Sequence, residues 1–194
     1  MLNHHAYFDS LSICNQLSLT LEKVAQIEVH LFAYLACLLS LYKKQPASAW
    51  EYKFGVTEQG YAFSSDIQRA LNVLINNGRL VVEGEYVQLT QTGIDEYVQL
   101  KALFQYSQRE PFIEGACSSA LAMPLGMIRD AISQEVDIKR AITLSQSRML
   151  LTEMATNTLY EQFQVLSDAI GVNIQDLMVP AVVWLNYLAQ HSLP

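Results

Sequence analysis

The sequence has few charged residues and few cysteines. Only 16% of its 194 residues are charged, whereas a typical soluble domain has about 25%. Cysteine occurs at Cys14, Cys37 and Cys117, an odd number without the close spacing of a metal site or a disulfide framework. Reduced thiols are the simplest interpretation, and they favour a cytoplasmic protein.

Motifs for nucleotide binding, metal binding and nucleophilic catalysis are absent. The sequence has no G-x-x-x-x-G-K-[ST] loop, no G-x-G-x-x-G turn, no H-E-x-x-H and no C-x-x-C. Cys117 has no His or acidic residue at a spacing that would nominate it as a nucleophile. Asp9, Glu22 and Glu28 are interpreted as scattered carboxylates. We therefore expect no enzymatic activity and no cofactor, and any ATP would be bound by a partner.

Long hydrophobic runs are also missing. The longest nearly apolar segment, "VHLFAYLACLLSLY" (Val29–Tyr42), is interrupted by His30 and Ser40. It is shorter than the roughly 20 residues that a bilayer requires. The first ten residues, "MLNHHAYFDS", do not have the positive region and apolar core of a signal peptide. No membrane segment is expected.

Positive charge is scarce, whereas apolar residues are abundant. The net charge is −7, and no basic tail or Lys/Arg run is present. Phosphate groups, which are negatively charged, repel a chain with this net negative charge. Hydrophobic residues make up 51% of the sequence, and the mean hydropathy is +0.15. Apolar faces with so little charged cover are expected to pack against partner proteins.

The first 42 residues predict a lead-in followed by one long helix. Residues 1–20 are mixed and are expected to be extended or partly helical, with His4 and His5 in a flexible terminus. Residues 21–42 contain no Gly or Pro, and their apolar run predicts a buried helix. Within it, His30 is interpreted as a hydrogen-bonded core histidine rather than a ligand, and Cys37 as a small buried hydrophobe.

The stretch "SSDIQRALNVLINNGRLVVEGEYVQLTQTG" (Ser64–Gly93) predicts a helix, a glycine stop and a β-hairpin. Ser64 or Ser65 is expected to cap the helix, and Gln68, three residues after Ser65, has the spacing that completes a capping box. A buried stripe is predicted for Ile67, Ala70, Leu71, Leu74 and Ile75. Gly78 is expected to end the helix and Gly84 to form the turn. A further helix follows Thr90, with a predicted face of Ile94, Tyr97, Val98, Lys101 and Phe104.

This order of elements is typical of a winged helix, in which the hairpin is the wing. The expected fold is mainly α: residues 1–110 form the long helix and the winged-helix module, and residues 111–194 form a C-terminal helical domain. The segment "QREPFIEG" (Gln108–Gly115) is the candidate boundary. In the last helix, Pro180 predicts a kink or a break.

The predicted wing helix presents residue types that can read DNA bases. These are Gln68, Arg69, Asn72 and Asn76, with Arg79 just beyond the helix. Between Ala47 and Leu100, however, three basic residues face seven acidic ones. The wing itself is "VEGEY". Because non-specific DNA affinity comes almost entirely from phosphate neutralisation, a protein-docking role is favoured over direct duplex binding.

Two aromatic groups are candidates for partner binding. Trp50, Tyr52 and Phe54 alternate as strand residues do, and Tyr61 and Phe63 follow them. The set either packs the core or contributes anchors to an interface, where Trp and Tyr are enriched. Trp184 and Tyr187, three positions apart in the last helix, present the same two alternatives.

Three segments carry a resemblance to a known family. They are "HLFAYLACLLSLYKKQPASAWEYKF", "YAFSSDIQRALNVLINNGRL" and the wing ending "LTQTG". Together, over residues 25–100, they resemble the small accessory (middle) component of three-component ABC systems, including the Lamassu-type anti-phage and anti-plasmid defence systems. The resemblance carries no catalytic motif.

The resemblance implies a non-enzymatic cytoplasmic subunit with two protein partners. One is an SMC-like ATPase with long coiled coils, and the other is an effector, often a nuclease, that is restrained until foreign DNA is sensed. DNA would be reached through the complex. The alternative function is a stand-alone winged-helix transcription regulator that dimerises through its C-terminal helices.

Overall fold

A computed structural model describes residues 2–171 and 174–190. The chain is 67% helix and 9% strand, which confirms the mainly α prediction. In order, the helices are α1 (His4–Ser18), α2 (Gln26–Tyr42), α3 (Ser65–Asn76), α4 (Gln91–Lys101), α5 (Phe104–Ser107), α6 (Glu110–Ala122), α7 (Leu125–Ser133), α8 (Val136–Leu144), α9 (Glu153–Ile170) and α10 (Met178–Gln190), with a 3-10 turn, η1, at Ala47–Trp50.

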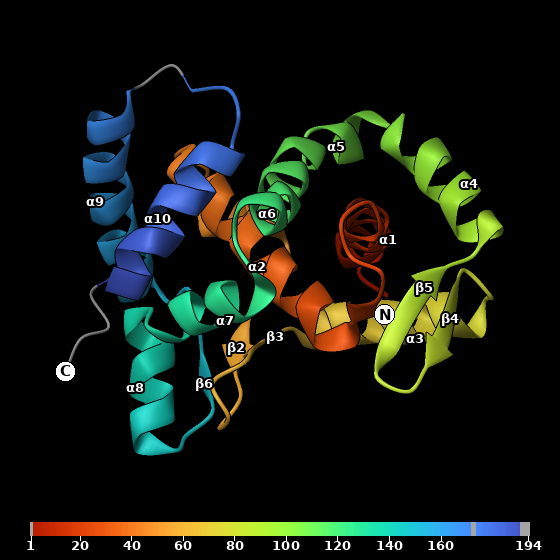
Figure 1. Cartoon of the computed structure of the whole chain (residues 1–194), viewed down its shortest axis with the longest axis horizontal. Coiled ribbons are helices and arrows are strands. Elements are labelled where there is room, and N and C mark those ends of the chain that lie inside the picture. The colour runs from red at the N-terminus through yellow and green to blue at the C-terminus, as the bar shows by residue number, and fades with distance from the viewer. Residues whose placement is uncertain (1, 172–173, 191–194) are drawn as a thin grey trace.

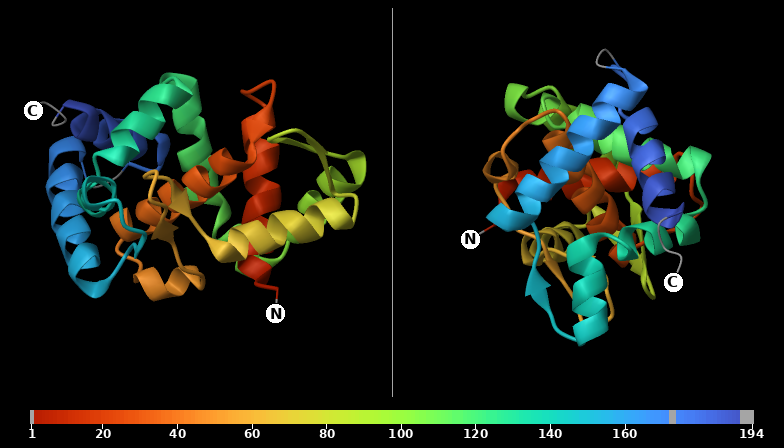
Figure 2. Two further views of the ribbon diagram at one scale, coloured as in Figure 1. Left: turned by 90° about the horizontal axis from the view of Figure 1, so that it is seen from below. Right: turned by 90° about the vertical axis from the view of Figure 1, so that its left-hand side faces the viewer.

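The strands form two small antiparallel sheets. The first has the order β1-β5-β4, with β1 at Val24–Ala25, β5 at Tyr86–Leu89 and β4 at Leu80–Glu83. The second has the order β3-β2-β6, with β3 at Ala62–Phe63, β2 at Gly55–Val56 and β6 at Arg148–Met149. Figure 2 shows the β4–β5 hairpin at one end of the molecule and α9 and α10 at the other.

Helix α1 is enclosed by the rest of the N-terminal part. In Figure 1 it is seen end on, and α3, the hairpin, α4, α5 and α6 form an arc around it. Residues 4–18 form this helix, so the partly helical alternative for the lead-in is confirmed, whereas the prediction of a flexible His4–His5 pair was wrong. The Oδ1 atom of Asn3 caps the helix by accepting bonds from the backbone N–H groups of His5 and Ala6. The His5 ring also lies 3.1 Å from a carboxylate oxygen of Glu51.

Helix α2 is the buried spine that the apolar run predicts. Every residue from Glu28 to Tyr42 is buried. The helix begins at Gln26 rather than Leu21, because Val24 and Ala25 pair with β5. Glu28 is not a scattered carboxylate. It accepts a bond from the backbone N–H of Ala25 at 2.8 Å and pairs with Arg129 of α7.

A buried ion pair joins α1 to the start of α6. The Nε atom of Arg109 donates to Asp9 at 2.8 Å, and its Nη2 atom donates to the second carboxylate oxygen. The hydroxyl of Tyr52 donates to the same carboxylate at 2.6 Å. Asp9 is completely buried, which corrects its interpretation as a scattered carboxylate.

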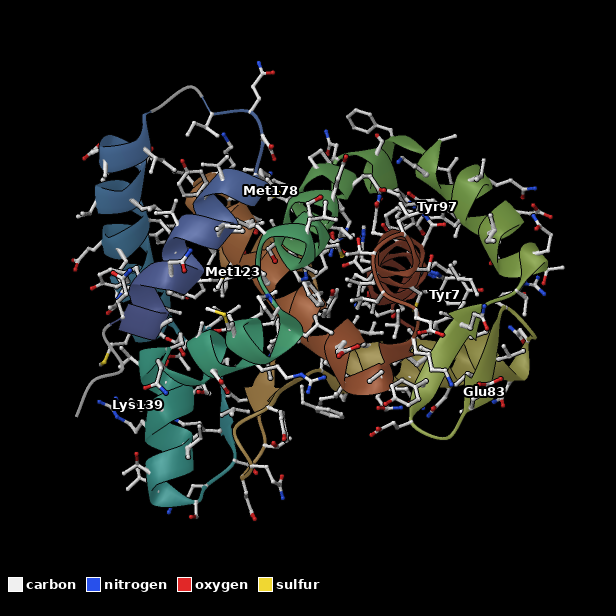
Figure 3. The ribbon with its side chains drawn as sticks, viewed as in Figure 1. Tyr7, Glu83, Tyr97, Met123, Lys139 and Met178 are labelled. Carbon is white, nitrogen blue, oxygen red and sulfur yellow. The ribbon has the colours of Figure 1, made fainter. Side chains whose placement is uncertain are left out.

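The neighbouring Glu110 is buried in a second polar cluster. Its carboxylate accepts bonds from Ser12 at 2.8 Å and from the hydroxyl of Tyr97, and Lys101 lies 3.1 Å away. Figure 3 shows Tyr97 on α4 beside α1. The candidate boundary at 108–115 is thus largely helical, with buried polar residues at its start, and it is not an exposed linker. The division into two domains near residue 110 stays a prediction.

The helix–hairpin segment follows its predicted pattern closely. Ile67, Ala70, Leu71 and Leu74 are fully buried. Gly78 and Gly84 have positive φ angles of 68° and 64°, as expected for a helix stop and a tight turn. The hairpin register pairs Glu83 with Tyr86 and Leu80 with Leu89.

Two local predictions around α3 and η1 were wrong. Ser64, one of the two predicted caps, is the N-cap, but the capping box does not form, because Gln68 bonds to His30 and Asn72 instead. Residues 50–54 are not a strand, because Trp50 ends η1 and β2 begins only at Gly55.

The predicted face of α4 also breaks after Lys101, where the helix ends. Phe104 begins α5 and is 77% exposed, and Val98 is 59% exposed. Val98 and Phe104 are therefore not buried with Tyr97, whereas Tyr106 of α5 is buried and stacks on Phe8, as Tyr97 does.

Pro180 causes no kink in the last helix. Helix α10 begins at Met178, so Pro180 lies in the first turn, where its missing N–H would have no intrahelical partner in any case. Among the described residues, no single helix is long and apolar enough to cross a membrane. Phe104–Ala122 and Leu125–Ser133 are long and apolar enough only when they are taken together, and this pair is bent by 115°.

We expect Arg109→Met to lower the free energy of unfolding by about 3–5 kcal/mol, because it leaves the Asp9 carboxylate buried without its charged partner. The matched control is Arg69→Met, which removes an exposed ion pair and should change stability by about 0.5 kcal/mol or less. Urea unfolding followed by circular dichroism measures both. Equal losses in the two variants would contradict a special role for the buried pair.

Candidate partner-binding surfaces

The outward face of α3 was the predicted DNA-reading surface, and its polar side chains are bonded to one another. Arg69 pairs with Asp66 at 3.0 Å, and its Nε atom donates to the carbonyl of Ser65 at 3.3 Å. The amide of Gln68 donates to Asn72 at 3.3 Å. Asn72 and Asn76 are exposed. These residues lie on one face of α3. Arg69, the only cation in this helix, is paired with Asp66 of the same helix.

Arg79, just beyond α3, is bound to α4. Its Nε atom donates to Glu96, and its Nη1 atom donates to the carbonyl of Asn77 at 2.8 Å. Glu96 also accepts a bond from Tyr7 of α1 at 2.7 Å, and Figure 3 shows Tyr7 on the side of α1 that faces the hairpin end. Although partial burial opposes it, the bonds from Arg79 and Tyr7 lower the pKa of Glu96. The Glu96 carboxylate therefore joins α1 and α4 to the segment between α3 and β4, and the charge of Arg79 is already matched.

The hairpin tip is acidic, as its sequence indicates. Glu83 lies 3.5 Å from the Nζ atom of Lys23, and this ammonium is also 5.6 Å from the centre of the Tyr86 ring. Glu85 is exposed in the turn. A DNA phosphate approaching this tip would meet two carboxylates and one cation, which is already paired.

Three residues of the first aromatic group pack in the core, whereas Tyr61 is 47% exposed and Phe63 is partly buried. Trp50, Tyr52 and Phe54 are 2%, 7% and 1% exposed. The guanidinium of Arg109 lies 3.9 Å from the centre of the Trp50 ring, so the buried cation is held between Asp9 and an aromatic face. These positions favour the core interpretation over the interface one.

The second aromatic group is divided between core and surface. Trp184 is 2% exposed and lies against Phe163 of α9, with their ring centres 5.5 Å apart. Tyr187 is 46% exposed. Only Tyr187 can therefore contact a partner without rearrangement of the helices.

His30 joins α2 to α3, as a hydrogen-bonded core histidine is expected to do. Its Nδ1 atom accepts the backbone N–H of Ser64 at 3.1 Å, and its Nε2 atom lies 3.2 Å from the side-chain oxygen of Gln68. The proton of the neutral ring is therefore on Nε2. Phe63 stacks on the ring with centres 4.6 Å apart. Burial lowers the pKa of His30 to about 4.

A groove on the outer face of the second sheet was not predicted. This groove, called here the β2 groove, has a volume of about 650 Å³. Its lining includes Lys53, Gly55 and Thr57 from the β2 segment, Phe63 and Ser65 next to α3, and Ser147 and Met149 from the β6 segment. The alternation that places Phe54 in the core would place Lys53 and Gly55 outside, but β6 could not be assigned from its sequence.

Cysteine and metal chemistry do not single out another site. Cys14, Cys37 and Cys117 are all buried and unpaired with one another, and burial raises the pKa of Cys14 to about 12. Within residues 2–171 and 174–190, no group of three or more His, Cys, Asp or Glu side chains is arranged to hold a metal ion.

Comparisons with known proteins found no similarity: no protein-family model, no curated protein and no solved structure matches this chain.

His30 generates a pH prediction. Because its pKa is lowered from 6.5 to about 4 in the folded chain, folding favours the neutral ring. The stabilisation is complete above about pH 6.5 and is lost as the pH falls towards 4. We expect wild type to lose about 2 kcal/mol more than His30→Asn between pH 7.5 and pH 4.5, since Asn can keep the bond from Ser64 without titrating.

Urea unfolding of wild type and His30→Asn at the two pH values measures this difference. Using the difference between the two proteins removes the contribution of carboxylates that titrate in both. Parallel pH profiles would show that His30 is not the titrating group.

Proposed function

We propose that this chain is a non-catalytic accessory subunit of an SMC-like ATPase–nuclease defence complex. It bridges or stabilises the ATPase heads or the adjoining coiled coil and helps to restrain the effector until phage or plasmid DNA is sensed. The observation that carries the docking part of this proposal is the internal neutralisation of the α3 surface, where Arg69 and Arg79 are both paired with carboxylates of the chain.

We further propose that α1 to β5 form a winged helix. The order helix, short strand, helix, helix and hairpin supports this, as does the β1-β5-β4 sheet in which the short strand joins the hairpin. In this interpretation α3 is the helix that other winged helices place in the DNA major groove. The segment of residues 43–63, which contains η1, β2 and β3, is an insertion between the second and third helices.

Charge supports protein contacts over duplex contacts for this module. A protein that binds DNA through its backbone needs several cations available to phosphate. Here the candidate cations are bonded to Asp66 and Glu96, and the hairpin adds Glu83 and Glu85. DNA would therefore be reached through the assembled complex.

Exposed apolar side chains support the existence of protein partners. Around the junction of α4 and α5, Val98, Leu103 and Phe104 are 59%, 49% and 77% exposed. Tyr187 of α10 adds a half-exposed aromatic ring at the other end of the molecule. Aromatic and aliphatic side chains in such positions are typical anchors of protein interfaces. The identity of the partners as ATPase and nuclease comes from the resemblance over residues 25–100.

Co-expression with the SMC-like and effector proteins encoded beside this chain tests the proposal. We expect a complex that survives gel filtration, and we expect Phe104→Glu or Tyr187→Ala to weaken it by reducing apolar contact. Leu19→Glu is the control for Phe104→Glu, since Leu19 is also 77% exposed but lies at the end of α1. A chain that stays alone in the presence of both partners would refute subunit membership.

The alternative function, a stand-alone DNA-binding regulator, is favoured by one observation: Arg69, Asn72 and Asn76 are exposed on α3. It requires salt-dependent binding to the gene's own promoter that is lost in Arg69→Ala. We expect no mobility shift of promoter duplex at low salt for either wild type or Arg69→Ala. A shift of wild type that disappears in the variant would favour the regulator instead.

A further inference from the structure

We propose that the β2 groove binds an extended segment of a partner protein in which a bulky apolar side chain lies next to an acidic one. The inference rests on the proposed function only in taking a partner subunit as the source of the segment. Apart from Phe54 and Phe63 of the first aromatic group, it assigns a binding surface to residues for which the sequence predicted no partner-binding role.

The hollow of the groove follows from the strand register. Gly55 is paired with Phe63 on one side and with Met149 on the other, and directly paired residues share a face of an antiparallel sheet. The opposite face carries Val56 and Ala62, which are buried in the core, and Arg148, which pairs with Val56. The outer face therefore has two large side chains with a glycine between them, which leaves room above Gly55 for one apolar side chain.

Gly55 is not a turn glycine. The glycines with positive φ are Gly60, Gly78, Gly84 and Gly171, so the backbone of Gly55 would accept another residue. A Cβ atom there would lie 3.2 Å from the carbonyl oxygen of Arg148 and 4.0 Å from the sulfur of Met149. The glycine thus allows β6 to approach closely, and it also keeps the floor of the groove open.

The charge at one end of the groove favours an acidic side chain on the occupant. Lys53 lines this end, and within the described residues it forms no ion pair with a carboxylate of this chain. The only acidic residue in the lining, Glu58, lies towards the other end. The ammonium of Lys53, in a protein of net charge −7, is complementary to a carboxylate on the bound segment.

The placement of these charges gives the segment a direction. Lys53 and Glu58 lie on opposite sides of Gly55 along the β2 segment. An acidic residue of the bound segment is therefore attracted to the end of the groove with Lys53 and repelled from the end with Glu58. The hydroxyls of Thr57, Ser65 and Ser147 also line the groove and can bond to the backbone of an extended chain. Met149, which is 50% exposed, can adjust its shape to different apolar side chains.

A displayed library of random peptides of about 12 residues, roughly 40 Å when extended, tests the inference on the isolated full chain. We expect the selected peptides to share a Leu, Phe or Trp next to Asp or Glu. For a synthetic consensus peptide, Met149→Glu and Lys53→Glu should each raise Kd about tenfold or more, because each places a carboxylate beside the bound one.

Two control variants match the test variants. Met127→Glu changes a methionine of α7 that is 47% exposed and does not line the groove. Lys139→Glu changes an exposed lysine of α8, labelled in Figure 3, that is also outside the groove. Both controls should bind the peptide as wild type does. Thermal unfolding of all four variants identifies any that fail to fold, and Lys53→Glu, at an exposed position, keeps the test valid if Met149→Glu does not fold.

Several results would overturn the inference. They are the absence of enriched peptides, enrichment of basic peptides, or binding that the groove variants leave unchanged. A dimer of this chain that Met149→Glu dissociates would identify a second copy as the occupant, and duplex DNA binding that Lys53→Glu abolishes would identify nucleic acid. The peptide selection uses no ATPase or nuclease. Failure of peptide binding to the groove and failure of co-purification with the partners can therefore be told apart.

Discussion

The buried Asp9–Arg109 pair is the interaction on which the arrangement of the chain depends. Removing two opposite charges from water is costly unless both are hydrogen-bonded. Here the carboxylate accepts bonds from the guanidinium and from Tyr52, and the guanidinium lies on the Trp50 ring. Although burial opposes its charge, Asp9 raises the pKa of Arg109. Because these partners come from α1, from η1 and the residues just after it, and from the start of α6, the pair fixes three separate segments at one point.

Side-chain pairing also explains why α3 is a poor candidate for DNA contact despite its residue types. Gln68 is bonded to His30, Arg69 to Asp66, and Arg79 just beyond the helix to Glu96. The same side chains that could read bases thus position α3 against α2 and α4. A nucleic acid would have to compete with these internal partners as well as with the carboxylates of the hairpin.

The two sheets differ in how their charges are matched. On the first sheet, the cation beside the hairpin, Lys23, is paired with Glu83. Beside the second sheet, Lys53 lines an open groove, and it forms no ion pair in the described part of the chain. The surfaces available for association are therefore the β2 groove and the exposed apolar side chains. The face with the DNA-reading composition is largely satisfied within the protein, which agrees with a docking subunit.

The sequence by itself determined the elements whose signals are local. The apolar run of α2, the 3.6-residue stripe of α3 and the left-handed Gly78 and Gly84 each follow from the properties of neighbouring residues. The tertiary structure decided the burial of α1, because Asp9 and Ser12 become core residues only through partners about 100 positions away. It also created the β2 groove, since β6 is too short to be recognised before it pairs with β2. Polar burial and two-residue strands depend on distant partners, and periodicity carries no information about them.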